Sequence, residues 1–143
     1  MYGIQTTVYE GSCCANQPIQ NNVSAIVNHF LIEYYRNTSN IGWNAAMYLF
    51  DKNCVVMFKD KNVGNSYDFL NVLSTESIKR ANYNSIRSKW MTLSNNSVLI
   101  NVFGNIQYVE FSGNMSTIIP FTETFVLTGN NGNFTCTHHM LDF

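Results

Sequence analysis

Residues 22–36 read NVSAIVNHFLIEYYR and contain the most regular hydrophobic pattern in the chain. Their large apolar side chains are separated by alternating steps of three and one residues, which is the repeat of one helix face. These side chains are Val23, Ile26, Val27, Phe30, Leu31, Tyr34 and Tyr35. The pattern predicts an amphipathic helix with Asn22 as its N-cap, packed along one stripe against the rest of the protein.

The segments that follow predict two more helices and then a sheet. A shorter helix is expected at about 41–50 and a third over 66–80, with a short apolar strand, Cys54–Phe58, between them. Beyond the third helix the pattern favours strands at Asn84–Thr92, Ser97–Phe111, Ser116–Thr128 and Asn133–Asp142. Gly104 marks a bulge or bend, and Gly129-Asn130-Asn131-Gly132 is a hairpin turn. We therefore predict an α+β fold, with three N-terminal helices packed on a curved, mostly antiparallel sheet.

Length and composition restrict the possible functions. A chain of 143 residues is one domain by length, and we expect an N-terminal extension over 1–20, with a short strand at Gln5–Tyr9, before a domain over 21–143. With 8 Lys and Arg against 9 Asp and Glu, the chain lacks the basic charge that duplex nucleic acid requires. No apolar run is long enough to span a membrane, and the first 20 residues do not resemble a signal peptide. We expect a cytoplasmic protein with no membrane partner.

The four cysteines, Cys13, Cys14, Cys54 and Cys136, have no metal-binding spacing. We expect free thiols, no metal and no cofactor. A redox or ligand pair at Cys13 and Cys14 is the alternative.

Three segments resemble the nuclear transport factor 2 family, including its transport-factor and stress-granule RasGAP-binding-protein branch. Phe30–Tyr35 resembles the F-x-x-x-Y-Y of the family's first helix, and Gly64 with Phe69 and Leu73 resembles its glycine-then-helix segment. Thr124–Leu127 and Phe134–Leu141 resemble its last two strands, with His138-His139 at the family's usual Asn-Asp. The resemblance covers about 22–143 and implies a cone, in which a bent sheet wraps the first helix.

The resemblance implies binding functions. It implies that Phe-Gly-containing peptides of nucleoporins or ribonucleoprotein and stress-granule regulators bind a groove lined by Ile26, Phe30, Met47, Leu49 and Leu141. The interpretation of these residues as plain core is the alternative. Relatives hold Ran in its GDP form through acids in the turn before the penultimate strand. Here that turn, Phe111–Thr117, has no acid, which argues against Ran-GDP binding. Action in transport would extend the location to the nucleus or nuclear envelope.

A hairpin turn at 129–132 predicts which residues of the last two strands lie opposite each other, and therefore which side chains share one face of the sheet. It places Glu123 opposite His138 and Phe121 opposite Met140, with His139 on the other face. The resemblance implies that this face packs against a second protomer. The expected homodimer interface is therefore Phe121, Glu123, Phe125, Phe134, Cys136, His138 and Met140.

The fold also hosts enzymes, so the catalytic alternative needs a test. A Glu123–His138 pair on an apolar face would suit acid–base chemistry, but a structural pair in an interface is the simpler interpretation. We expect no catalytic residues and a non-enzymatic adaptor. A deep pocket holding His139 and a carboxylate within about 3 Å would reverse that expectation. The alternatives are an isomerase- or dehydratase-type enzyme that uses the cone, and a bare dimerisation module.

Overall fold

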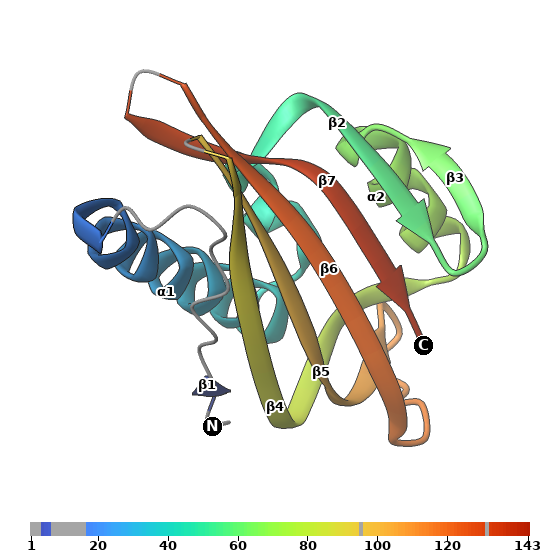
Figure 1. Cartoon of the computed structure of the whole chain (residues 1–143). Helices are drawn as coiled ribbons and strands as arrows, with labels where there is room; N and C mark the ends of the chain where they lie inside the picture. The colour runs from blue at the N-terminus through green and yellow to red at the C-terminus, as the bar shows by residue number, and fades with distance from the viewer. Residues whose placement is uncertain (1–3, 7–16, 95, 131) are drawn as a thin grey trace.

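The computed structural model describes residues 4–6, 17–94, 96–130 and 132–143 (Figure 1). The helical elements are α1 (Gln17–Asn40), the 3-10 helix η1 (Trp43–Leu49) and α2 (Ser66–Thr75). The strands are β1 (Ile4–Thr6), β2 (Phe50–Phe58), β3 (Lys61–Gly64), β4 (Ile78–Ser94), β5 (Ser97–Glu110), β6 (Ile119–Asn130) and β7 (Asn133–Asp142). The predicted α+β class and the mostly antiparallel sheet are confirmed.

One seven-stranded sheet, in the order β1-β4-β5-β6-β7-β2-β3, curves around α1 (Figure 1). β4 to β7 form an antiparallel meander, whereas β1 pairs with β4 and β2 pairs with β7 in parallel. Both α1 and α2 lie behind the sheet in the view of Figure 1. The concave face of the sheet therefore carries the core, and its outer face carries neither of these helices.

The helix stripe predicted from the sequence is the centre of this core. Val27, Leu31, Tyr34 and Tyr35 are all at most 1% exposed. The inner side chains of the strands complete the core, among them Ile86, Ile100, Ile106, Phe125 and Leu127. A helix that lies inside a cone is covered over a wide angle, which explains why two adjacent tyrosines are both buried.

Several element boundaries differ from the sequence prediction. α1 begins at Gln17, inside the predicted extension, and the second helix is a 3-10 helix. α2 begins with a capping box between Asn65 and Asp68 and ends at Thr75, where Ser77 takes a φ of 63° that stops the helix. β4 therefore begins at Ile78, where a helix was expected. The predicted strand Gln5–Tyr9 corresponds to β1 only at its start, and its residues 7–9 lie outside the described residues.

Candidate functional site

A polar cluster lies inside the cone, between α1 and the last two strands. Its five members are Tyr34, Tyr35, Trp43, Glu123 and His139, and each is at most 1% exposed. α1 provides the tyrosines, η1 the tryptophan, β6 the glutamate and β7 the histidine. We call these five residues the buried cluster.

The carboxylate of Glu123 is the centre of the buried cluster. Its Oε1 accepts a hydrogen bond from the Tyr35 hydroxyl at 2.7 Å, and its Oε2 accepts one from the Tyr34 hydroxyl. The Nε2 atom of His139 lies 2.6 Å from the same Oε2. The Trp43 indole donates to the Tyr34 hydroxyl at 2.9 Å. Protein groups thus surround both carboxylate oxygens, and the cluster joins α1 and η1 to the sheet.

Both tyrosines of the cluster are held in their neutral, donating form. Burial raises the pKa of Tyr34 and of Tyr35 well above 10.0, and the negative charge on Glu123 raises both further. A neutral phenol that donates to a carboxylate satisfies the polar atoms of both groups inside an apolar core. The arrangement therefore stabilises the fold.

The imidazole of His139 has an aromatic environment. Its ring stacks on Phe125 with centroids 5.0 Å apart and meets Phe69 edge-on at 5.4 Å. Phe50 and Tyr34 lie at 5.2 and 5.9 Å. The Nδ1 atom of His139 is buried and has no hydrogen-bond partner. His139 therefore contacts Glu123 through one ring nitrogen only.

The sequence predicted the wrong histidine for this contact, and a bulge explains the error. Thr128 faces Thr135 and Leu127 faces Cys136, but Val126 then faces His138, so Thr137 is an extra residue on β7. The Thr137 hydroxyl contacts Thr128 Oγ1 at 2.8 Å and His138 Nδ1 at 3.0 Å. One extra residue inverts the faces beyond it. His139 consequently points inward to Glu123, and His138 points outward.

The same bulge divides the predicted dimer face, so the prediction that all seven residues share one face is wrong. Phe121, Glu123, Phe125 and Cys136 are core residues at most 2% exposed. Phe134 is half-buried beside Gly129, its cross-strand partner. His138 and Met140 are exposed on the outer face.

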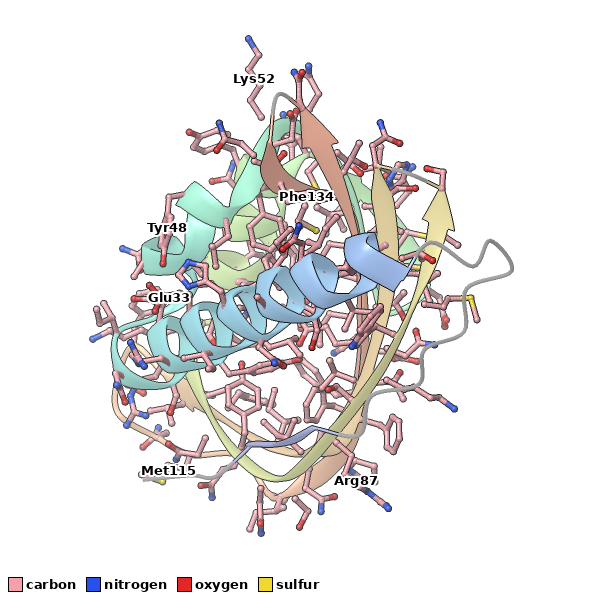
Figure 2. The ribbon with its side chains drawn as sticks, turned by 60° about the vertical axis from the view of Figure 1, so that its left-hand side comes forward. Glu33, Tyr48, Lys52, Arg87, Met115 and Phe134 are labelled. Atoms are coloured by element: carbon pink, nitrogen blue, oxygen red, sulfur yellow. The ribbon has the colours of Figure 1, made fainter. Side chains whose placement is uncertain are left out.

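The predicted peptide groove is only partly at the surface. Phe30 and Leu141 are core residues, 4% and 1% exposed, and cannot line an open slot. Ile26, Met47 and Leu49 are half-buried and pack against the core. In Figure 2, Phe134 lies above the N-terminal half of α1, and Tyr48 lies above its C-terminal half near Glu33. The Tyr48 hydroxyl donates to Glu33 Oε1 at 3.3 Å, which connects η1 to α1.

The remaining predictions concern metals, thiols and the Ran-binding turn. Among the described residues, no three His, Cys, Asp or Glu side chains gather as metal ligands. Cys54 and Cys136 are free, buried thiols, whereas Cys13 and Cys14 lie outside the described residues.

The turn after β5 exposes Phe111 and Met115 and has no acid over 111–117. No described helix has the length and apolarity that a membrane span needs.

The model of the nuclear transport factor 2 (NTF2) domain matches residues 26–143. The chain belongs to the NTF2 domain family. The match spans α1 from Ile26 through β7, so the elements of the cone are those of an NTF2 domain. No curated protein matches the chain in sequence.

Solved structures share this NTF2 fold at low sequence identity. Nuclear transport factor 2 from Cryptosporidium parvum has 15% identity and a TM-score of 0.62, with 89% of this chain and 95% of that one covered. A ketosteroid isomerase-like protein from Erwinia carotovora atroseptica has 13% identity, a TM-score of 0.62, and coverage of 89% and 96%. An NTF2-like superfamily protein from Salmonella enterica serovar Typhimurium has 10% identity, a TM-score of 0.65, and coverage of 85% and 91%. At such identities the similarity shows the fold alone.

Proposed function

We propose that this NTF2 domain is a non-enzymatic binding module that acts as a homodimer. The observation that carries the proposal is an apolar area on the outer face of the sheet. The buried cluster supports the non-enzymatic part, because its acid and its histidine are enclosed and contact each other instead of solvent.

Two rows of cross-strand neighbours form this area, and its apolar side chains lie in the first row and at the β2 and β7 end of the second. The first row consists of Val55, His138, Val126, Leu99 and Met91, and we call it the outer row. The second row runs parallel to it and consists of Met57, Met140, Thr124, Asn101 and Lys89. Val55, Met57, Met91 and Met140 are 44%, 37%, 44% and 47% exposed. A contiguous exposed apolar area of this kind is typical of a protein interface.

The occupant that we propose is a second copy of the chain. The outer face of the sheet carries neither α1 nor α2, so it is open to the isologous contact of a two-fold dimer, in which the same surface serves both protomers. The polar pair within the second row is already satisfied, because Thr124 Oγ1 donates to Asn101 Oδ1 at 2.8 Å, so this pair could be covered at little cost. The family resemblance also implies a protomer on this face. These arguments support the interface around Met140 that the sequence predicted.

Met140→Glu tests the dimer. A carboxylate at this position would lose its water in the interface, so we expect the mass in solution to fall from dimer to monomer. Light scattering coupled to size exclusion measures it. Met115→Glu is the matched control, because Met115 is 58% exposed on a turn outside both rows and should leave the mass unchanged. A wild-type monomer at all concentrations would overturn the proposal.

For the second partner, we propose a Phe-Gly-containing peptide of the kind found in nucleoporins and ribonucleoprotein regulators. The half-buried side chains of Ile26, Met47 and Leu49 support this proposal, since they can cover a phenylalanine ring without unfolding the core. A ring of about 150–200 Å² supplies only a few kcal/mol before entropy costs, so binding should be micromolar or weaker. The protein would then act in nucleocytoplasmic transport or ribonucleoprotein assembly.

Chemical-shift changes on adding a Phe-Gly peptide measure this binding. Met47→Glu should weaken it tenfold or more, with Met115→Glu again as the control. Met47 is a suitable test position because it is half-buried, whereas Leu141 is 1% exposed and a charge there would unfold the strand. Unchanged affinity in Met47→Glu would remove these residues as the peptide site.

An acid–base enzyme is the second candidate, and the Glu123–His139 contact at 2.6 Å favours it. The ketosteroid isomerase-like neighbour has the same fold. Against this stands the burial of every member of the cluster, since a catalytic group must reach its substrate. Turnover of an unsaturated ketosteroid that Glu123→Gln abolishes, with the variant still folded, would establish the enzyme. We expect no turnover.

A further inference from the structure

His138 lies within the apolar area. It is the titratable member of the outer row, and its cross-strand neighbours are Val55 on β2 and Val126 on β6. Its Nδ1 atom contacts the Thr137 hydroxyl at 3.0 Å, which leaves Nε2 for the surface. A partner that covers this row must therefore cover the imidazole.

Charged groups near His138 are few, and none lies next to it in either row. On its own strand, Asp142 is four residues away, about 13 Å along an extended chain. On β2, Asp51 and Lys52 precede Val55, and Asp51 accepts a hydrogen bond from the Asn53 backbone at 2.8 Å. On β4, Lys89 and Arg87 lie over the Phe103 ring at 5.9 and 5.4 Å, and β4 is three strands away from β7 in the sheet. Among the described residues, no carboxylate forms an ion pair with His138, and Glu123 on the neighbouring β6 is buried on the opposite face of the sheet with His139.

We propose that dimerisation of this chain is proton-linked through His138, so that the dimer forms with neutral His138 and weakens when His138 is protonated. This inference rests on the proposed homodimer. Histidine changes charge between about pH 5 and 8, whereas the apolar neighbours do not titrate. Covering an unpaired imidazolium removes its hydration without an opposite charge in return. Two protomers bring two such histidines, which doubles the effect.

The experiment measures the dimer dissociation constant by sedimentation equilibrium at about pH 8 and about pH 5.5. For the wild type we expect the constant to rise tenfold or more on acidification. His138→Gln, which keeps a polar side chain but cannot take up a proton, should show the same constant at both pH values. His29→Gln is the matched control, because His29 is exposed on α1, away from the outer face, and this variant should keep the full pH dependence. Circular dichroism at both pH values checks that the protomers stay folded.

The possible outcomes separate the two proposals. A monomer at both pH values overturns the homodimer itself. A dimer of equal strength at both pH values, or a stronger one in acid, overturns the His138 inference and leaves the homodimer standing. If the dissociation constant of His138→Gln still depends on pH, the His138 inference is also overturned, since another group would then take up the proton.

Discussion

Tyr35 and Glu123 are 88 positions apart in the sequence, and the Tyr35 hydroxyl donates a hydrogen bond of 2.7 Å to Glu123 Oε1. Tyr34, the preceding residue, donates to the other carboxylate oxygen. Two consecutive helix residues thus hold one glutamate of β6. The contact fixes both the rotation of α1 and its position along the cone, because two hydroxyls reach the same carboxylate only in one placement of the helix.

Tyr35→Phe should destabilise the protein by about 2 kcal/mol, because the substitution leaves Glu123 Oε1 buried without this donor. The midpoint of urea unfolding measures the change. Tyr67→Phe is the control, since Tyr67 is 62% exposed and loses only a hydroxyl in water. Equal midpoints for the two variants would show that the buried hydrogen bond contributes nothing.

Glu123→Gln should cost about 3 kcal/mol or more, because an amide cannot accept from both tyrosines and His139 as a carboxylate does. Unfolding in urea again provides the measurement. The same change at Glu76, which makes a surface ion pair of 3.4 Å with Lys59, should cost less than about 1 kcal/mol. A stable Glu123→Gln protein would mean that the cluster is not structural, and would favour the catalytic alternative.

The protein should lose stability as the pH rises above about 10. Burial raises the pKa of Tyr34 and Tyr35 in the folded state, so these residues keep their protons there while the unfolded chain releases them. Proton release then favours unfolding, by up to about 1.4 kcal/mol per pH unit for each tyrosine. Unfolding free energies from pH 9 to 11 test this, with the phenolate absorbance recorded in parallel. The Tyr34→Phe/Tyr35→Phe double variant should show a shallower slope; an identical slope would contradict the assignment.

Gly104→Ala should destabilise the sheet by about 1–3 kcal/mol. A Cβ at Gly104 would lie 3.0 Å from the backbone oxygens of Asn84 and Ser85, at the bulge of β4 where Ser85 takes a φ of 57°. Backbone atoms inside a paired sheet cannot move aside easily. Asn105→Ala, one residue along β5, serves as the control, and thermal unfolding compares the two. Equal melting temperatures would show that the β4 backbone moves away from the added Cβ at this bulge without loss of stability.

Local patterns in the sequence determined the class of fold. The three-and-one spacing of α1, the apolar strands of the meander and the Gly129–Gly132 turn are properties of neighbouring residues, and hydrophobic periodicity reports them directly. Glu123 also stood out from the sequence, because it interrupts the apolar residues of one strand face. The sequence pattern marks its two tyrosine donors only as members of the helix stripe.

Tertiary structure decided which residues meet. The Thr137 bulge turns His139 inward and His138 outward, and no residue type at 137 marks a bulge in the sequence. The sequence predicts the turn at 129–132. Between this turn and the bulge, the predicted pairing of β6 with β7 is two residues off, and beyond the bulge it places the β7 side chains on the wrong face of the sheet. Strand register depends on packing against partners far away in the chain, and a slip of one residue exchanges the two faces. The sequence alone therefore determined the helix stripe, the strands and the NTF2 cone, whereas the Glu123–His139 contact and the position of His138 on the outer face required the packed sheet.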